Sequence, residues 1–518
     1  MKKNLLAIIV SISTFTITAA NATAQTFNAG LAAMLQDTLN TYFTAFNNIK
    51  GMTASVYLPG QGIWQGKMGL SYTGQSITQD MAFGVASNTK LFVAVTMLKL
   101  AESNKISLDD PLYKWLPAYT NVDPNITIRQ LLNHTSGISD PLFVSPWMDT
   151  IIANPTRVFT PVTVLSWLGA PNFAKGSGWG YSNVNYILAG KVAQSATGFH
   201  ISRLIRDSIL TPLNLDSTFY DVEEPVTGTL AHRWWNGGSG SISDYSGVSR
   251  VGLNTAGGAA GSIFSTSSEM VQWYNALFSG QILNATSMAA LKNFVATPNP
   301  AQQYSLGLFR ETTLGLTYWG HGGDTWGYKS KLMYDSSMGV VVSGLSNSYP
   351  DGMTSIPFLL YRVIKNHVPA YTGNITGLST VIQGQNNVTY AVNPIANVVT
   401  YIWTLPNGAT GTSSTNSITV NYGMAAVSGK ITVRGNNIYG VGNASALAVT
   451  VNSGNANTTN GNVGINVDAP QRNLHIKDVI RLEPRSQAPD NPVEGDIYYD
   501  GLLKKLRVFD GTVWQNCW

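Results

Sequence analysis

The sequence of 518 residues is long enough for about three domains. Hydrophobic residues make up 44%, which supplies a buried core and excludes a chain that is disordered throughout, whereas charged residues make up only 11%. The formal net charge is +4 and no long basic run occurs, so the sequence lacks the electrostatic pattern of a nucleic-acid-binding protein. Cys517 is the single cysteine, which excludes a disulfide framework and a thiolate metal cluster.

The first 24 residues have the pattern of a secretory signal peptide. A short basic start at residues 1–3 precedes an apolar stretch at residues 5–18, and Ala22-Thr23-Ala24 is a small-x-small cleavage pattern. The apolar stretch is shorter than the roughly 20 residues that cross a bilayer, and no lipid-anchoring cysteine follows it. We therefore predict a signal peptide at 1–24 and an exported protein (periplasmic, cell-surface or secreted) with no integral membrane segment after cleavage.

Residues 25–368 combine strand and helix patterns. Short apolar runs at residues 53–58 and 63–68 predict strands, and residues 331–334 and 340–344 predict a late hairpin. Helical spacing or helix-length apolar runs occur in five further stretches: 91–100, 128–133, 184–194, 269–278 and 356–366. Strands at both ends with helices between them predict an α/β fold of the α+β type, with an antiparallel sheet, flanking helices and an all-helical region.

Residues 369–452 have a different composition. Lys430 and Arg434 are the only charged side chains between residues 370 and 460, and short alternating runs are separated by Gly and Asn turns. This pattern predicts a small β-sandwich with Trp403 in its core. The segment resembles the PKD-like, immunoglobulin-type modules of secreted bacterial enzymes, and we expect no chemistry in it.

The remaining residues predict a linker and a β-rich tail. Residues 453–461 are rich in Gly, Asn and Thr, which is typical of a flexible linker. Within the tail at 462–518, residues 462–476 resemble the short β repeat of phage tail-fibre-like and bacterial surface proteins, and residues 495–511 resemble the hairpin that follows it. A β tail that packs on the sandwich is the alternative. Either C-terminal module is a candidate for binding a cell surface or a glycan.

The first candidate catalytic motif is Ser87-Asn-Thr-Lys90, which follows a strand-like run and begins the apolar helix at 91–100. Residues three apart share a helix face, so the Lys90 amine is expected beside the Ser87 hydroxyl. A helix N-terminus favours negative charge developing on Ser87. A surface helix with a serine cap is the alternative, but the turns after Lys90 are almost wholly apolar.

Two further motifs contain candidate polar groups. Tyr181-Ser-Asn183 follows a Gly/Trp-rich loop and begins another helix, where Tyr181 is suited to take a serine proton and Asn183 to orient a substrate amide. Later, Trp-Gly-His-Gly-Gly-Asp-Thr-Trp-Gly (319–327) precedes the predicted hairpin. Its glycines permit close backbone approach, and His321 is the histidine whose setting best fits a site. Each motif alone is also compatible with a purely structural role.

The three motifs together, in this order, resemble the serine β-lactamase and penicillin-binding family. The closer branch contains class C β-lactamases, D-alanyl-D-alanine carboxypeptidases and esterases, which typically have tyrosine in the second motif. Residues 128–137 (Ile-Arg-Gln-Leu-Leu-Asn-His-Thr-Ser-Gly) and 256–266 fit the same branch. The resemblance covers residues 27–367.

The resemblance implies the residue roles. Ser87 would be the acyl-enzyme nucleophile, Lys90 and Tyr181 would share general acid and base work, and Asn183 would contact the substrate amide. The backbone N–H groups of Ser87 and Asp324 would form an oxyanion hole, in which each donor typically supplies about 3 kcal/mol. Gly322 and Gly323 would line the substrate site. No metal or organic cofactor is implied, and the sequence has no metal-binding spacing of histidines and cysteines.

Two residues depart from the β-lactamase pattern. True β-lactamases usually have lysine in place of His321, where it helps to bind a substrate carboxylate. We expect His321 to do so only when protonated, so that binding of anionic substrates would strengthen as the pH falls toward the ordinary histidine pKa of about 6.5. Asp324 stands where many relatives have a small uncharged residue, and its charge disfavours an anionic substrate.

Three functions from two classes therefore stay open. The leading one is an exported D-alanyl-D-alanine carboxypeptidase-like serine hydrolase that acts on peptidoglycan stems or D-amino-acid peptides. An esterase, or a weak class C-like β-lactamase, on the same site is the nearest alternative; Asn183 favours an amide substrate over an ester, which has no N–H. A catalytically silent surface-binding protein is the third, and the intact Ser87, Lys90 and Tyr181 argue against it.

Overall fold

The structure is a computed structural model that describes residues 26–46, 48–142, 144–237, 241–313, 315–350, 355–370, 373–452, 456–459, 462–465, 474–476 and 480–517. The predicted signal peptide lies outside these residues. The described chain divides into two compact units. The first contains the described residues up to 370 together with 395–400 and 434–444, and the second contains 373–394, 401–433 and the described residues from 445 onward.

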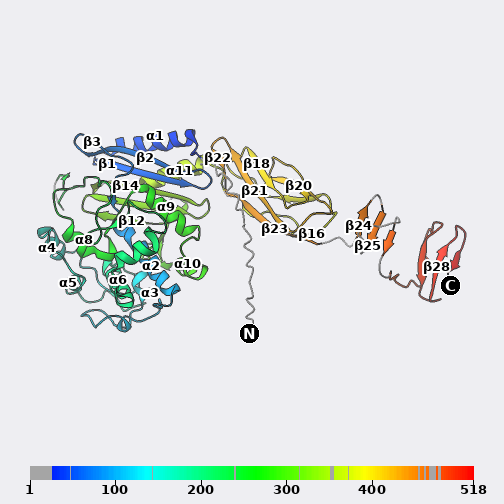
Figure 1. Ribbon diagram of the computed structural model, residues 1–518, viewed down its shortest axis with the longest axis horizontal. Helices are drawn as coiled ribbons and strands as arrows, with labels where there is room; N and C mark the ends of the chain where they lie inside the picture. The colour runs from blue at the N-terminus through cyan, green and yellow to red at the C-terminus, as the bar shows by residue number, and fades with distance from the viewer. Residues whose placement is uncertain are drawn as a thin grey trace, which may run out of the picture. The chain divides into compact units, whose positions relative to one another are not determined.

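An antiparallel sheet forms the frame of the first unit (Figure 1). Over the described residues it has nine strands in the order β3-β2-β1-β14-β13-β12-β11-β10-β9. Their bounds are β1 (Gly51–Leu58), β2 (Gly62–Tyr72), β3 (Gln75–Ser76), β9 (Val295–Ala296), β10 (Gln302–Tyr304), β11 (Phe309–Thr313), β12 (Leu316–Thr325), β13 (Tyr328–Asp335) and β14 (Val340–Ser346). β1 and β14, which come first and last in the chain among these nine strands, thus pair with each other inside the sheet.

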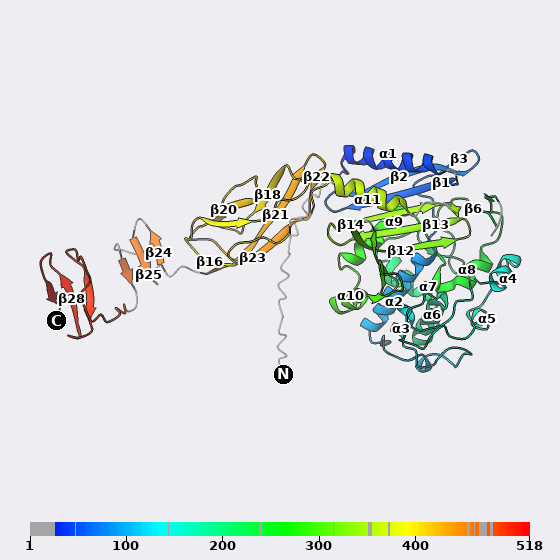
Figure 2. The same ribbon diagram turned by 180° about the vertical axis from the view of Figure 1, so that it is seen from behind.

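Helices cover both faces of this sheet (Figure 1 and Figure 2). α1 (Ala29–Ala45) and α11 (Ile356–His367) lie on one face, and α9 (Ser267–Phe278) packs on the other. The remaining helices belong to a helical region on the α9 side: α2 (Thr89–Glu102), α3 (Ile128–Leu132), α4 (Trp147–Ala153), α5 (Pro161–Leu165), α6 (Asn183–Thr197), α7 (Ile201–Ile205), α8 (Val251–Gly257) and α10 (Ala285–Leu291). The predicted antiparallel sheet with flanking helices and an all-helical region is confirmed.

The alternation of β1 explains why two cores form. Met52, Ala54 and Val56 are buried against α1 and α11. Ser55 faces the opposite way, and its hydroxyl oxygen lies 2.8 Å from that of Ser267 at the start of α9. Successive strand residues point to opposite faces, so a single strand contributes to both layers. α1 was not predicted from the sequence, although its Leu31, Leu35 and Leu39 recur every four residues and are fully buried.

Two short sheets connect the helical region to the main sheet. β4 (Phe83–Gly84), β8 (Ile263–Ser265) and β5 (Phe219–Tyr220) form one sheet in the order β4-β8-β5. β15 (Ser348–Tyr349), β6 (Trp234–Trp235) and β7 (Ser243–Asp244) form the other. β4 leads directly into α2, so the first of these sheets fixes the start of that helix.

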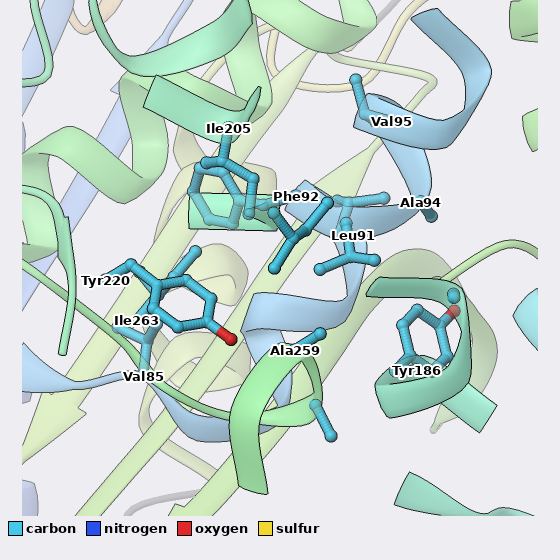
Figure 3. Close-up of a cluster of buried hydrophobic side chains, with 14 of the residues drawn as sticks. Val85, Leu91, Phe92, Ala94, Val95, Tyr186, Ile205, Tyr220, Ala259 and Ile263 are labelled. Carbon is cyan, nitrogen blue, oxygen red and sulfur yellow. The ribbon is translucent and has the colours of Figure 1, made fainter. Parts of the chain in front are cut away.

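α2 is buried on all sides over its first ten residues. Figure 3 shows four of its side chains (Leu91, Phe92, Ala94 and Val95) among residues from other elements, including Tyr186 of α6, Ile205 of α7 and Ile263 of β8. Phe92 also stacks on Trp273 of α9, with 4.6 Å between ring centroids. The prediction of a buried helix from its nearly uniform apolar sequence is therefore confirmed, and a polar group within residues 89–98 lies in a dry environment.

The second unit is an all-β arrangement, and its strand pattern continues into residues 434–444, which fall in the first unit. One sheet has the order β16-β23-β21-β18, with β22 paired to β21, and a second has the order β17-β20-β19. Their bounds are β16 (Thr380–Ile382), β17 (Val388–Ala391), β18 (Thr400–Thr404), β19 (Ala409–Thr410), β20 (Ser417–Tyr422), β21 (Gly429–Asn437), β22 (Gly440–Val441) and β23 (Ser445–Asn452). The predicted β-sandwich is confirmed.

Its core aromatics differ from the prediction. Trp403 is partly exposed, and its indole N–H donates to the Thr415 carbonyl. Tyr390 and Tyr422 are fully buried instead, and their hydroxyl oxygens lie 2.7 Å apart. A hydrogen bond between the two phenols offsets the cost of burying both hydroxyl groups, whereas the Trp403 indole N–H makes its hydrogen bond near the surface.

Two further groups of strands follow. β24 (Ala456–Thr459) pairs with β25 (Asn462–Ile465), which pairs with β26 (Leu474–Ile476). β27 (Ile497–Asp500), β28 (Lys505–Phe509) and β29 (Trp514–Asn516) form an antiparallel sheet. Residues 456–459 were predicted as part of a flexible linker but form a strand. Pairing with β25 satisfies their backbone hydrogen-bonding groups, which the Gly- and Asn-rich composition does not predict.

Candidate active site

Ser87 lies at the junction between β4 and α2. Residues Ala86–Asn88 form one turn of 3-10 helix, and Ala86 has a φ of 48°. A positive φ is uncommon for a residue with a Cβ and costs about 1–3 kcal/mol. The turn is held from both sides: the Asn88 amide donates to the Ser330 hydroxyl at 2.8 Å, and the Ile263 N–H donates to the Thr89 hydroxyl at 3.0 Å. Contacts from β13 and β8 thus stabilise the strained backbone before Ser87.

The Lys90 amine lies within hydrogen-bonding distance of three oxygens. Nζ is 3.0 Å from Ser87 Oγ, 2.7 Å from Asn183 Oδ1 and 2.8 Å from the Ala260 carbonyl oxygen. The last two groups only accept hydrogen bonds. A neutral amine therefore uses its two N–H bonds for Asn183 and Ala260, which turns its lone pair toward the Ser87 hydroxyl. This arrangement suits Lys90 to accept the Ser87 proton.

Burial makes that neutral form accessible near neutral pH. Lys90 is fully buried, and the cost of desolvating its charge lowers its pKa from 10.5 to about 7, although the charge of Asp140 opposes this shift. A base whose pKa lies near the operating pH is the most effective one for general-base catalysis. The lysine of a Ser-x-x-Lys motif gains this property only because α2 is buried.

Tyr181 adjoins the same hydroxyl. A hydrogen bond links its side chain to that of Ser87, and Lys90 Nζ lies 4.9 Å from the centre of its ring. Burial raises the pKa of Tyr181 well above its usual value, and the charges of Asp140 and Asp324 add to this effect. The phenol is therefore protonated at neutral pH and is suited to donate a proton.

Asn183 is the first residue of α6, and both ends of its amide are engaged. Its Oδ1 accepts from Lys90, while its Nδ2 and its backbone N–H donate to the Asp140 carboxylate at 2.8 and 2.9 Å. Asp140 also accepts from the Leu142 N–H at 3.1 Å. Asp140 was not predicted from the sequence, where its one signal is its place three residues after the segment 128–137.

The structure differs from the expectation for His321. Its imidazole is only 3% exposed, with Nδ1 2.5 Å from the Gly322 carbonyl oxygen and Nε2 3.3 Å from the Tyr304 hydroxyl. Burial, with a smaller effect from the charge of Lys90, lowers its pKa to about 3. A ring that is neutral above this pKa offers no cation to a substrate carboxylate, so the expected pH-dependent anion binding does not follow from this geometry.

The glycines after His321 have separate structural roles. A Cβ on Gly323 would lie 2.2 Å from the Val85 carbonyl oxygen and 2.5 Å from Ser330 Oγ, whereas one on Gly322 would meet nothing closer than 3.8 Å. Gly323 therefore permits β12 to approach the chain just before Ser87. Asp324 follows it, is half exposed and pairs with Lys329 at 3.1 Å. The role of the Ser87 and Asp324 N–H groups as oxyanion hole stays a prediction.

His134 is a second residue that the sequence analysis left without a role, although it falls within 128–137. Its ring is fully buried and lies 4.4 Å from the ring of Tyr181, centroid to centroid. Its Nδ1 accepts from the Ser182 N–H at 3.3 Å and lies 2.9 Å from Asn185 Nδ2, so it is fixed by α6 and the residue before it. His134 thus supports the ring of Tyr181 from behind.

A cavity of about 70 Å³ lies in front of Ser87. Its walls are mostly apolar, and polar groups come from Ser87, Asn183, Asn254, Asp324 and Thr325. The apolar lining side chains include Leu142, Met148, Ile151, Leu253 and Trp326. In the described part of the chain, histidine, cysteine and carboxylate groups nowhere gather in threes at a spacing that would hold a metal ion.

A comparison with protein families decides the assignment. Residues 39–357 match the family model described as Beta-lactamase, which covers more than half of the chain. The chain belongs to the beta-lactamase family. Residues 368–449 of this beta-lactamase-family protein also match the model of a PKD-like domain, which confirms the resemblance seen in the sequence.

Known relatives agree with this assignment. Penicillin-binding protein 4* of Bacillus subtilis (strain 168) is 32% identical over 139 residues, which are 26% of this chain and 30% of that relative. A D-stereospecific amidohydrolase from Streptomyces sp. is 26% identical with a TM-score of 0.56, covering 64% of this chain and 97% of that one. D-amino acid amidase from Ochrobactrum anthropi SV3 shares the fold, with 23% identity, a TM-score of 0.58 and 65% and 99% coverage.

The beta-lactamase-family unit therefore brings together Ser87, Lys90, Tyr181 and Asn183, which the sequence placed almost a hundred residues apart. Asp324 reaches the same cavity from β12. His321 lies behind it, buried beside Tyr304.

Proposed function

We propose that this protein is a serine amidohydrolase that cleaves the amide bond on the carbonyl side of an apolar D-amino acid, in amides or short peptides. The observation that carries the proposal is the lining of the cavity beside Ser87. Its walls are apolar, Asp324 is its one charged lining side chain, and in the described part of the chain no lysine or arginine lines it. This lining suits a substrate with an apolar acyl group and an uncharged or cationic group next to the scissile bond.

The same lining argues against a free carboxylate beside the scissile bond. Lys90 holds three hydrogen bonds inside the site, and burial keeps His321 neutral. A substrate carboxylate would instead meet Asp324, which has the same sign of charge and already pairs with the nearby Lys329 at 3.1 Å. We therefore place an amidase before the carboxypeptidase expected from the sequence. The similarity to a D-stereospecific amidohydrolase over 97% of that chain supports the same order.

In the proposed mechanism Ser87 Oγ attacks the substrate carbonyl while neutral Lys90, 3.0 Å away, accepts the hydroxyl proton. The backbone N–H groups of Ser87 and Asp324 would stabilise the oxyanion. The departing amine needs a proton, and Tyr181 is suited to supply it because burial keeps its phenol protonated. Water then attacks the acyl-enzyme, with Lys90 and Tyr181 exchanging roles.

A D-alanyl-D-alanine carboxypeptidase is the second candidate, and peptidoglycan stems would be its substrates. The observation in its favour is the 32% identity to penicillin-binding protein 4*, although the matched region spans only 30% of that relative. We place esterase, weak β-lactamase and catalytically silent surface-binding functions after these two.

Side-by-side turnover tests the order of these functions. We would compare D-phenylalanine amide, L-phenylalanine amide, an N-acyl-D-alanyl-D-alanine peptide, a nitrophenyl ester and a chromogenic cephalosporin, with Ser87→Ala as control. We expect kcat/KM for the D-amide to exceed that for the peptide at least tenfold. A preference for the free-carboxylate peptide would establish the carboxypeptidase function. Turnover of the ester alone would establish the esterase function, and no turnover of any substrate would favour the catalytically silent surface protein.

We further propose that the protein is exported. The support is the signal-like sequence at residues 1–24. Separately, none of the helices in the described residues has the length and apolar character of a membrane span. N-terminal sequencing of the protein from intact cells and culture medium tests this proposal, with cleavage after Ala24 expected. Sedimentation with insoluble peptidoglycan, for the full chain and for a chain ending at residue 368, tests whether the C-terminal modules bind a surface.

A further inference from the structure

Asp140 is the residue at which three N–H donors converge. Its Oδ2 accepts from the Asn183 backbone at 2.9 Å and from Asn183 Nδ2 at 2.8 Å, and its Oδ1 accepts from the Leu142 N–H at 3.1 Å. An ionised carboxylate only accepts hydrogen bonds, so all three donors are satisfied at once. The Asp140 carboxylate thus requires the NH2 end of the Asn183 amide to face it.

The orientation of Asn183 decides what Lys90 meets. With Nδ2 turned toward Asp140, Oδ1 points at Lys90 Nζ and accepts from it at 2.7 Å. In the opposite orientation Nδ2 would face the amine and compete with Ser87 for its lone pair. We propose that Asp140 is a positioning residue, whose carboxylate fixes the direction of the hydrogen-bond chain from Asn183 through Lys90 to Ser87.

The chain has a single direction in this arrangement. Asn183 donates to Asp140 and accepts from Lys90, and the Lys90 amine lies 3.0 Å from Ser87 Oγ. When Lys90 is neutral, both of its N–H bonds are used by Asn183 and Ala260, so its lone pair is left for the Ser87 proton. Each hydrogen bond fixes the direction of the next, because each group has only one donor or acceptor function left once its first hydrogen bond is made. Asp140 also has a purely structural role, since it accepts from the first N–H of α6 and so caps that helix. A test must separate the two.

The charge of Asp140 distinguishes its positioning role from its helix-capping role, because the charge stabilises the protonated form of Lys90. The other titratable groups around Lys90 do not change charge near neutral pH. Burial lowers the pKa of His134 and His321 and raises that of Tyr181 and Tyr186. Removing the carboxylate charge should therefore move the Lys90 titration to lower pH, whereas loss of a helix cap alone would not move it.

The proposal rests on the proposed serine hydrolase function, so the test uses a neutral covalent probe that needs no amide substrate. The rate of fluorophosphonate labelling of the full chain would be measured from pH 5 to 9 for wild type and for Asp140→Asn, Asp140→Glu and Asp149→Asn. Asp149 is an exposed carboxylate on α4 and serves as the matched control. An asparagine at 140 accepts at one end only, so one of the three donors must face its NH2 group.

We expect Asp140→Asn to lower the plateau rate at least tenfold and to shift the acid limb of the profile down by about one pH unit. Asp140→Glu keeps the charge and should retain the wild-type acid limb with part of the rate, and Asp149→Asn should match wild type. An unmoved acid limb, an unchanged plateau, or equal losses with glutamate and asparagine would each overturn the proposal. Wild type that is not labelled at Ser87 would instead refute the serine hydrolase function.

Discussion

Replacing Lys90 with methionine measures how strongly burial disfavours the lysine charge. The folded chain holds the Lys90 pKa at about 7, below the 10.5 of an unperturbed lysine. Between these two values the unfolded chain binds one proton more than the folded chain, so the free energy of unfolding of the wild type rises with pH. The full interval corresponds to about 5 kcal/mol, of which about 2 kcal/mol falls between pH 7 and pH 9.

Methionine has similar length and no charge to desolvate. It also leaves Asn183 Oδ1 and the Ala260 carbonyl without their donor, which costs about 1–3 kcal/mol each at every pH. The change with pH is therefore the informative quantity. Below pH 7 the methionine variant should be most favoured relative to wild type, and this advantage should shrink by about 2 kcal/mol on going from pH 7 to pH 9.

The assay is urea unfolding of the full chain at pH 6, 7, 8 and 9, followed by tryptophan fluorescence. Lys99→Met on the same helix is the control, because Lys99 is partly exposed and its amine donates to the Ile282 carbonyl at 3.2 Å. A difference between Lys90→Met and wild type that stays constant from pH 6 to 9 would refute the lowered pKa and, with it, the assignment of Lys90 as base.

Four other outcomes are expected. Ser87→Ala should abolish the single fluorophosphonate adduct, and labelling that survives would exclude Ser87 as the nucleophile. A chain ending at residue 368 should keep wild-type kcat/KM on small substrates, because the composition changes there and we place the site before it; loss in a folded truncation would contradict this. Gly323→Ala should lower the free energy of unfolding by about 1–3 kcal/mol and Gly322→Ala should not, since only the first Cβ overlaps Val85 and Ser330; equal urea midpoints would contradict this. His321 should stay neutral from pH 5 to 9, so the kcat/KM ratio of carboxylate-bearing to neutral substrates should not follow a histidine titration; a ratio that rises below pH 7 would show a protonated His321.

Several features could be predicted because they are local. The uniform apolar character of α2 predicted its burial, and the alternating runs beyond residue 369 predicted a β-sandwich. Three ordered motifs identified the family. α1 escaped prediction although its leucines recur every four residues, and residues 456–459 were assigned to a linker because composition does not show which strand pairs with which.

The sequence by itself predicted that the Lys90 amine lies beside the Ser87 hydroxyl at the start of a buried helix, since three residues of separation and an apolar run are enough for that. Only the tertiary structure decided the chemistry of the groups around them. Asp140 and Asn183 are 43 residues apart in the sequence, and the fold brings them into hydrogen-bond contact. His321 is buried beside Tyr304, which keeps its imidazole neutral. The Lys90 amine is shielded from water by α6 and by the turn that contains Ala260. Desolvation and hydrogen-bond direction depend on segments that are distant in the chain. A local sequence pattern can therefore identify the candidate residues, but only the tertiary contacts determine their protonation states.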